Sequence, residues 1–331
     1  MKQQAKSVTI YDIARKMKVS PATVSRALKD HYSISKETTR AVKKTARSMG
    51  YLPNTLASSL RSNKSHTIGI LISRINRPFM SSLISGIEEV ANREGYNIFI
   101  SQSFDSASKE VSNAEAMFSS RVDGLIVSLA METIDFKHFE LFKDKHIPLV
   151  FVDRVPPEME ANKIVIDNFN AAYKATEHLI KQGCKSIAHF GGAQHRNVYK
   201  QRKEGYEAAL QKYQLSIDEK LILYSNLGEE EGFTMTEQLF QLPQSPDAIF
   251  SANDTAAVSA IRFARDKGIK VPQELAVVGF NDDYLASIIS PSLTTIAHPA
   301  FEMGKIAARQ LLEQKENVDL VASKTTVLKT E

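Results

Sequence analysis

The stretch KVSPATVSRAL, residues 18–28, decides the architecture of the N-terminal part of the chain. Ser20 is a good N-cap and Pro21 suits the first helical position, where its missing N–H costs nothing, so a helix is expected to begin here. Three apolar residues at helical spacing form its buried face: Val24, Ala27 and Leu28. The outward side chains are mostly small or polar: Pro21, Ala22, Ser25, Arg26 and Lys29, with Thr23 near the boundary. Such a face is suited to lying close against another surface.

Two further short helices are expected on either side of this one. Thr9 and Asp12 form a capping box, and the helix that follows buries Ile10, Ile13, Ala14 and Met17. The third helix starts after Ser35, stops at Gly50, and is expected to bury Ala41, Val42, Thr45, Ala46 and Met49. Three short helices with a tight turn before the second are typical of a helix-turn-helix DNA-binding domain. In that interpretation, small side chains let the helix enter the major groove closely. The alternative is a three-helix bundle that merely packs.

Charge is divided unevenly along the chain. Residues 1–66 contain 14 Lys and Arg but only three acidic residues, Asp12, Asp30 and Glu37, although the net charge of the whole chain is +4. The remainder is therefore acidic. A basic head on an acidic body indicates a polyanionic partner for the head, and a solvated charged face is the alternative. Together, the charge and the small helix face favour nucleic acid.

The segment YLPNTLASSLRSNKS, residues 51–65, follows the head. Leu56, Ala57 and Leu60 would share one side of a helix of about eight residues, which is too short to be stable alone in water. The segment is either a flexible linker or a hinge that folds on DNA with an apolar wedge in the minor groove. We therefore divide the chain into a helix-turn-helix domain (1–52), a hinge or linker (53–65) and a body (66–331).

The body alternates apolar, strand-like runs with helical stretches such as residues 78–93. The runs are TIGILI (67–72), YNIFIS (96–101), GLIVSL (124–129), PLVFVD (148–153), SIAHFGG (186–192), AIFSAN (248–253) and LAVVGF (275–280). Continuous apolar strands between helices imply parallel sheets covered on both faces. Two such series predict two doubly wound subdomains, with a ligand in the crevice at the carboxyl ends of the strands.

Polar side chains follow several of these strands. They are Asp153, Arg154, Asn253, Asp254, Asn281, Asp282 and Asp283, and Arg196 and Arg202 lie beyond the run at 186–192. Carboxylates, amides and guanidinium groups in one cleft suit multidentate hydrogen bonding to hydroxyls. Asp254 could equally cap the next helix. Because the three arginines outnumber the acids expected beside them, an anionic sugar is favoured over a neutral one, unless Arg154 points to solvent or braces the subdomains.

Other function classes find little support. The sequence has no GxSxG, Walker, GxGxxG or HExxH motif, and its eight histidines lack metal-ligand spacing. Cys184 is the only cysteine, so no intrachain disulfide or cysteine zinc cluster is expected. No signal peptide or membrane-spanning run is recognisable. We expect a cytoplasmic protein that is not an enzyme and uses no cofactor or metal. A sugar-binding protein or a sugar-modifying enzyme with a fused basic head is the alternative.

Four stretches, in order and spacing, closely resemble the LacI/GalR family of bacterial transcriptional regulators over essentially the whole chain. They are VTIYDIARKMKVSPATVSRAL, GYLPNTLASSLRS, ANDTAA and VVGFNDDYLASIISPSLTTI. The resemblance implies a homodimeric repressor that binds a palindromic operator in double-stranded DNA and responds to a small effector, a sugar or sugar derivative. It also implies a body like the periplasmic binding proteins, with subdomains at 66–168 plus 298–322 and 169–297 plus 323–331.

The resemblance further implies roles for individual residues. Phosphate-contacting or orienting positions are Thr9, Tyr11, Ser20, Thr23, Ser25 and Asn54. Base-reading positions are Pro21, Ala22 and Arg26, and hinge contacts are Ala57 and the wedge Leu60. Effector-contact positions are Phe79, Asp153, Arg196, Arg202, Asn253 and Asn281, to which the strand-end chemistry adds Arg154. Two positions depart from the family pattern: Asn281 stands where Asp is usual, and Leu227 where many members place a stacking aromatic.

Overall fold

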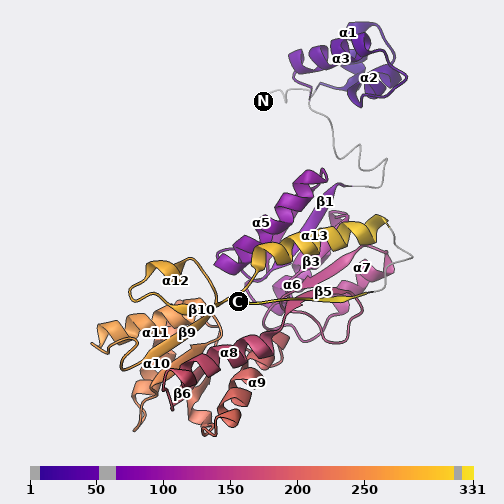
Figure 1. Ribbon diagram of the computed structural model, residues 1–331. Coiled ribbons are helices and arrows are strands. Elements are labelled where there is room, and N and C mark those ends of the chain that lie inside the picture. Colours follow the sequence, from indigo (N-terminus) through magenta and orange to yellow (C-terminus); the bar gives the residue numbers. More distant parts are fainter. Residues whose placement is uncertain (1–7, 52–64, 317–322) are drawn as a thin grey trace, which may run out of the picture. The chain divides into compact units, whose positions relative to one another are not determined.

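The computed structural model describes residues 8–51, 65–316 and 323–331, and divides the chain into two compact units, Met1–Ser65 and His66–Glu331 (Figure 1). We describe each unit by itself. The predicted hinge residues Asn54, Ala57 and Leu60 lie outside the described residues.

The head contains three helices where the sequence predicts them: α1 (Ile10–Met17), α2 (Pro21–Leu28) and α3 (Lys36–Ser48). The capping box is confirmed, because the Thr9 hydroxyl accepts the Asp12 N–H while the Asp12 carboxylate accepts the Thr9 N–H at 2.9 Å. Gly50 has a φ of +68°, as a helix-terminating glycine requires. The buried core is Ile13, Ala14, Val24, Ala27, Val42 and Ala46. The expectation that Ala41 is buried is wrong: it faces solvent, because the interior side of α3 is fixed by Val42 and Ala46.

The first subdomain of the body is built on a six-stranded sheet of order β11-β5-β4-β3-β1-β2. Its strands are β1 (Thr67–Ile72), β2 (Asn97–Gln102), β3 (Gly124–Val127), β4 (Leu149–Val152), β5 (Asn162–Ile166) and β11 (Thr325–Leu328). Its helices are α5 (Pro78–Arg93), α6 (Ala107–Ser119), α7 (Glu140–Asp144) and α13 (Ala300–Glu316), with the short 3-10 helix η1 (Lys137–Phe139).

The second subdomain is built on a five-stranded sheet of order β10-β9-β8-β6-β7. Its strands are β6 (Ile187–Gly191), β7 (Ile222–Tyr224), β8 (Ala248–Ser251), β9 (Ala276–Asn281) and β10 (Thr294–Ala297). Its helices are α8 (Asn168–Lys181), α9 (Asn197–Lys212), α10 (Glu229–Phe240), α11 (Asp254–Asp266) and α12 (Leu285–Ile288), with η2 (Glu219–Leu221). The strand pairings described in both sheets are parallel, which confirms the doubly wound architecture.

The seven predicted strands are all present, but four others were not predicted: β5, β7, β10 and β11. These strands are short, and β5 and β11 alternate between more and less buried residues, so neither forms a continuous apolar run. Assigning residues 323–331 to the second subdomain is wrong. β11 pairs with β5 in the first sheet, with Thr326 opposite Ile164, and the Thr326 hydroxyl accepts a 2.9 Å hydrogen bond from Gln310 of α13.

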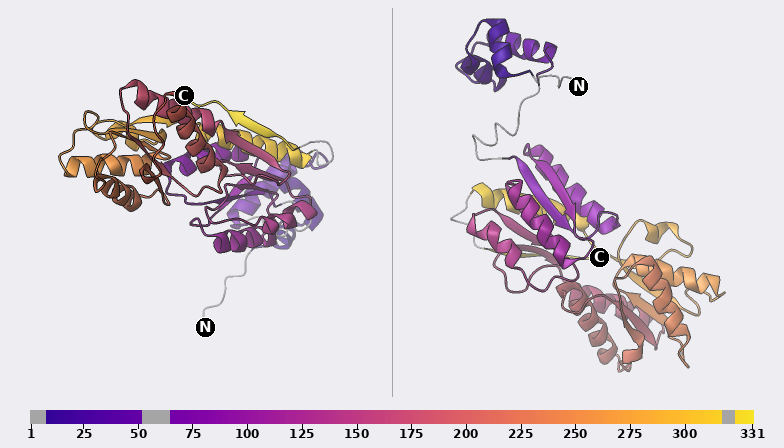
Figure 2. Two further views of the ribbon diagram at one scale, coloured as in Figure 1. Left: turned by 90° about the horizontal axis from the view of Figure 1, so that it is seen from below. Right: turned by 180° about the vertical axis from the view of Figure 1, so that it is seen from behind.

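The helix α13 returns the chain to the first subdomain, where it lies along α5 although the two are far apart in sequence (Figures 1 and 2). A Cβ at Gly304 would lie 2.1 Å from the Leu83 carbonyl oxygen, and one at Gly86 would lie 2.0 Å from that of Phe301. The two helices therefore touch backbone to backbone at their glycines, which fixes the position of α5.

His189 of β6 makes the stability of the body depend on pH. Its ring is fully buried and stacks between Tyr206 and Phe250 at 5.1 and 5.0 Å, and burial lowers its pKa to about 4. An unfolded histidine titrates near 6.5, so the unfolded chain binds this proton first, and stability is lost as pH falls from 6.5 towards 4. We expect this group to contribute at most about 3 kcal/mol to that loss. Urea unfolding of the wild type and of His189→Gln at pH 7.5 and 5 should show a shallower loss for the variant. Equal losses would contradict the prediction.

Candidate nucleic-acid interface and effector cleft

The helix α2 carries the predicted DNA-reading residues on its outer face. Ala22 and Arg26 are exposed, and Pro21, Thr23 and Ser25 are half-buried. The Ser20 hydroxyl caps the helix by accepting the Thr23 N–H at 3.1 Å and also lies 2.9 Å from the Thr23 hydroxyl. These capping bonds fix the first turn of α2, so its outer face is held in one orientation.

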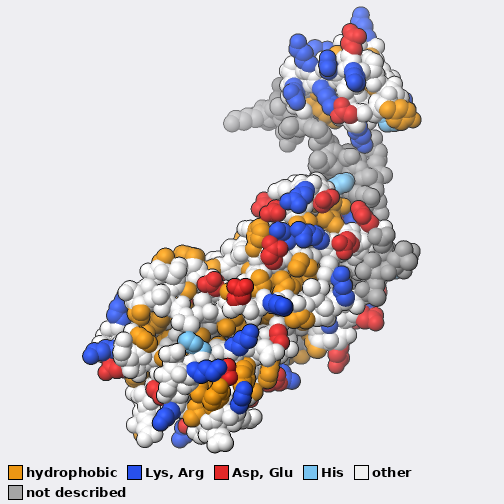
Figure 3. All heavy atoms as spheres, in the orientation of Figure 1, with side chains coloured by type: hydrophobic (Ala, Val, Ile, Leu, Met, Phe, Trp, Pro, Cys, Tyr) orange, Lys and Arg blue, Asp and Glu red, His pale blue; other side chains and the backbone are white. Residues whose placement is uncertain are grey.

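The surroundings of α2 add aromatic and basic groups. Tyr11 is 64% exposed, and Tyr32, which the sequence analysis did not select, is 94% exposed and stacks on His31 at 4.4 Å. Lys and Arg side chains are spread over the visible face of the head (Figure 3). Exposed aromatic and cationic side chains of this kind can contact phosphates and sugars. The Thr9 hydroxyl is already engaged, because it donates to Asp12 at 2.7 Å.

The body contains a cleft at the carboxyl ends of strands from both sheets. Its lining residues come from the ends of β1, β4, β8 and β9, the loops after β2 and β7, and the starts of α5, α9 and α11. Six of the seven predicted effector residues line it: Phe79, Asp153, Arg154, Arg202, Asn253 and Asn281. Lining residues that the sequence analysis did not select include Arg77, Asp105, Tyr199, Asn226 and Thr255.

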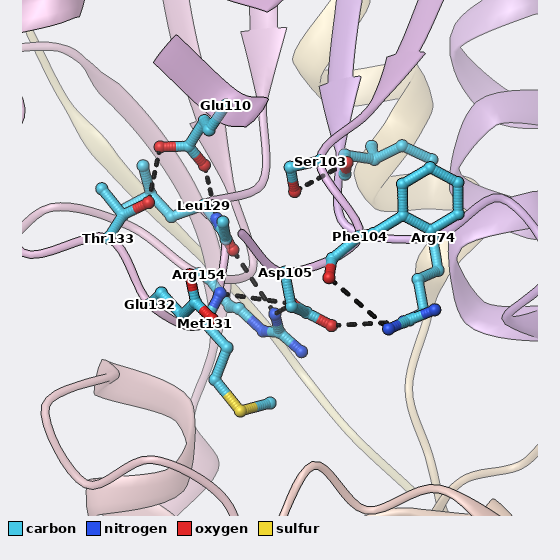
Figure 4. A network of polar contacts seen from close by, with 12 residues as sticks. Arg74, Ser103, Phe104, Asp105, Glu110, Leu129, Met131, Glu132, Thr133 and Arg154 are labelled. Carbon is cyan, nitrogen blue, oxygen red and sulfur yellow. Dashed lines mark hydrogen bonds and ion pairs between the residues drawn. The ribbon is translucent and has the colours of Figure 1, made fainter. Parts of the chain in front are cut away.

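Arg154 is anchored to both subdomains. Its Nη1 lies 2.6 Å from Asp105 Oδ1 (Figure 4). Its Nη2 donates to the Tyr199 hydroxyl at 2.8 Å. Burial opposes the charge, but Tyr199, Asp105 and Asp153 together raise the pKa of Arg154 above its ordinary value. Arg154 is therefore a paired, permanently charged residue, as the bracing alternative supposed.

Arg202 is the second guanidinium of the cleft and is nearly inaccessible to solvent. Its Nη1 donates to the Ala252 carbonyl at 2.6 Å, its Nε donates to Asn168 at 2.9 Å, and it lies 3.6 Å from the centre of the Phe280 ring. Burial lowers its pKa to about 10, against the attraction of Asp153. Arg202 therefore stays protonated at neutral pH, held by its own subdomain.

Arg196 is not among the residues that line the cleft. It is the N-cap of α9, is 3% exposed, and lies 5.9 Å from the centre of the Phe136 ring, while its Nε has no hydrogen-bond partner. Burial lowers its pKa, and Glu110 opposes this shift. The contact with Phe136 places this side chain between the subdomains and not among the cleft residues.

Two further strand-end residues have structural roles. The buried Asp254 carboxylate accepts the Thr295 hydroxyl at 2.6 Å and the Asp283 N–H at 2.7 Å. Asn253 caps α11 through the Ala256 N–H at 2.9 Å, although it also lines the cleft. Leu227, at the expected position of a stacking aromatic, is fully buried and does not line the cleft.

The lining of the cleft contains equal numbers of basic and acidic residues. The three cations Arg77, Arg154 and Arg202 face the three acids Asp105, Asp153 and Asp283. Burial and then Asp254 raise the pKa of Asp283 to about 7, against the opposing effect of Arg77. Arg154 is paired with Asp105, Arg202 is hydrogen-bonded within its own subdomain, and Arg196 does not line the cleft, so the reason for expecting an anionic ligand does not hold.

Strained backbone positions present several of these groups. Asp153 has a φ of 63° and Asn281 a φ of 121°, in the left-handed region that non-glycine residues rarely adopt. Such positions cluster at ligand sites, where the surrounding structure maintains them.

Within the described ranges, no group of three or more His, Cys, Asp or Glu side chains could hold a metal ion. The helices seen in those ranges are too short or too polar to cross a bilayer.

Comparison with known proteins gives the family. Residues 9–54 match the lacI family of bacterial regulatory proteins, and residues 176–331 match a periplasmic binding protein-like domain. The chain is 33% identical over 316 residues to the HTH-type transcriptional repressor CytR of Escherichia coli K12, which covers 95% of this chain and 92% of that protein. It is equally identical to catabolite control protein A of Priestia megaterium, with 95% of each chain covered.

Solved structures of transcriptional regulators also match this chain. The transcriptional regulator CelR in complex with cellobiose is 26% identical, with a TM-score of 0.74 and 98% of each chain covered. The lac repressor dimer bound to operator and an anti-inducer has a TM-score of 0.87 at 24% identity over 98% of this chain and 97% of that one, and shares the fold. The chain belongs to the lacI family of bacterial regulatory proteins and is a DNA-binding transcriptional regulator with an effector-binding domain, not an enzyme.

Proposed function

We propose that this regulator is a homodimeric repressor whose affinity for a palindromic operator is set by a neutral sugar or sugar derivative bound in the cleft. It acts in the cytoplasm, where it meets DNA. The observation that carries the proposal is the mixed polar lining of the cleft, in which guanidinium, carboxylate and amide groups from both subdomains surround one space. Two relatives support it, one solved with cellobiose and one, a LacI-family regulator from Enterococcus faecium at 25% identity, with bound ribose.

A neutral, hydroxyl-rich ligand suits this lining. Asn226, Asn253 and Asn281 offer both donors and acceptors, and each hydroxyl of a sugar can also donate and accept. Phe79 and Tyr199 add apolar faces for the ring carbons. Binding then exchanges water for matched partners without adding a charge to the site.

The residues assigned to DNA fall into two groups. Base readers are Pro21, Ala22 and Arg26; phosphate-contacting or orienting residues are Thr9, Tyr11, Ser20, Thr23 and Ser25. Asn54, Ala57 and the wedge Leu60 complete the interface as proposals outside the described residues.

The dimer contact that we propose is an apolar surface on the second subdomain. Tyr284 and Ile288 are 66% and 68% exposed. Ile288 borders a groove that is lined by Val258, Ile261 and Ile289 together with Arg262, Arg265 and Ser290. Large exposed apolar side chains can mark interaction sites, and a second copy of the chain would cover these two.

Effector and operator are coupled through the contact between the subdomains. Asn197 of α9 donates to the Asp153 carbonyl at 2.9 Å and accepts the Val155 N–H at 3.0 Å. The dimer is in equilibrium between two arrangements of its subdomains. An effector shifts this equilibrium only as far as its affinities for the two arrangements differ.

The proposal is tested by selecting DNA fragments with the purified full chain and measuring binding to the selected site with neutral sugars, their acids and their phosphates. We expect one palindromic sequence and a change in affinity with a neutral sugar. A response to charged forms alone would contradict the proposed effector class.

A substitution at Ala22 tests base reading. Ala22→Gln places a longer polar side chain on the exposed face of α2, so it should change the preferred base at one position by about 1–3 kcal/mol. Ala41→Gln is the matched control, because Ala41 is an exposed alanine on α3. Fluorescence anisotropy with single-base operator variants measures both. Uniform weakening of all sequences by Ala22→Gln would show that the position does not read bases.

A further inference from the structure

The ion pair between Asp105 and Arg154 is the closest charge contact in the cleft. Asp105 lies in the loop after β2, and Arg154 follows β4. The Asp105 Oδ1 atom is 2.6 Å from Arg154 Nη1 and accepts the Met131 N–H at 3.2 Å, while Oδ2 lies 3.6 Å from Arg74 Nε (Figure 4). Two cationic side chains therefore converge on one carboxylate.

The surroundings keep Asp105 ionised and fixed. Burial alone would raise its pKa, but Arg154, the Met131 N–H and Arg74 together hold the pKa below its ordinary value. Phe104 and Asp105 have φ angles of 54° and 67°, two consecutive left-handed residues. The Asp105 carbonyl accepts the Glu132 N–H at 3.2 Å, which holds the strained turn in place.

Asp105 differs in this respect from the other two acids of the cleft. Burial raises the pKa of both Asp153 and Asp283. These two carboxylates therefore take up a proton more easily than Asp105 does. Asp105 carries a full charge against Arg154 at neutral pH.

We propose that Asp105 is a specificity-determining residue, which occupies the guanidinium of Arg154 and thereby makes the cleft select neutral over anionic ligands. A ligand carboxylate or phosphate that approached Arg154 would have to displace a half-buried carboxylate already in place. The inference rests on the proposed function only in taking the cleft as the effector site.

The test uses the full chain with inorganic phosphate as the probe, in calorimetric titrations and thermal melts at pH 7.5. Asp105→Asn removes the negative charge that faces the Arg154 guanidinium, so we expect this variant to bind phosphate at least about tenfold more tightly than the wild type, as for one gained charge-assisted bond. Asp135→Asn is the matched control, because Asp135 is an exposed acid of the same subdomain paired with Lys137 at 3.3 Å. The basic head is identical in all these chains, so any phosphate that it binds contributes equally and does not affect the comparison between them.

Adding Arg154→Gln to Asp105→Asn should remove the gain. Circular dichroism establishes folding, and Asp105→Ser replaces Asp105→Asn if that variant does not fold. The proposal is overturned if a folded Asp105→Asn or Asp105→Ser variant binds phosphate no more tightly than Asp135→Asn does. It is also overturned if the gain in phosphate affinity remains when Arg154 is replaced, or if neither Asp105 variant folds. A wild type that binds phosphate equally well also overturns it. A wild type that binds no neutral sugar would instead refute the proposed effector class, and the phosphate comparison would still be readable.

Discussion

A chain that lacks residues 1–65 will show no measurable binding to the operator that the full chain selects, yet its body will unfold at an unchanged denaturant concentration. The division between the two compact units falls after Ser65, and the three core clusters of the body contain only residues beyond His66. The excess of Lys and Arg also lies within residues 1–66. Since phosphate contacts provide much of the affinity and the head carries the base readers, we expect the whole specific affinity to be lost.

Gel-shift titration at several salt concentrations and urea unfolding followed by circular dichroism measure the two properties. The control is the full chain with Ala41→Gln, which should keep both. Operator binding by the truncated chain would place the DNA site in the body and contradict the assignment.

Replacing Arg202 with Met will abolish the response to effector and destabilise the body by about 3–5 kcal/mol, because it leaves the buried Asp153 without its strongest cationic neighbour. The bonds to Asn168 and the Ala252 carbonyl are lost as well. Lys203→Met is the matched control on the same helix, because Lys203 forms an ion pair with Glu207 at 3.1 Å near the surface. We expect this control to lower the free energy of unfolding by less than about 1 kcal/mol.

The destabilisation in Arg202→Met should depend on pH. Burial already raises the pKa of Asp153, and loss of Arg202 raises it further. The folded variant then binds a proton that the unfolded chain has released, so the variant loses stability as pH rises from acid to neutral. Urea unfolding of variant and wild type at pH 5 and 7.5 should therefore give a smaller difference at pH 5. A difference that does not vary with pH would show that Asp153 is not the group left uncompensated.

The rule that parallel strands end at one edge of a sheet was sufficient to predict much of the cleft. Asp153, Arg154, Asn253 and Asn281 directly follow or end buried strands, and each lines it. Asp105 lies three residues after the end of β2, so the same rule also predicts its place at the cleft.

Other features depend on contacts that spacing does not encode. Arg196 is the N-cap of α9 with an extended backbone, whereas Arg202 lies inside the helix, so their spacing in the sequence does not place the two side chains on one face. Arg77 and Asp283 belong to different subdomains, and no local sequence pattern predicts the electrostatic interaction between them. The strands β5 and β11 escaped prediction because half-exposed residues interrupt their apolar pattern.

The pairing of β11 with β5 bears on the order in which the chain can be assembled. The second sheet uses strands from Ile187 to Ala297 without interruption. The first sheet needs β11, and its helix α13 lies beyond Ala300. During synthesis from the N-terminus, the subdomain that begins first is therefore the one completed last, and its edge at β5 stays open until Thr325–Leu328 have left the ribosome.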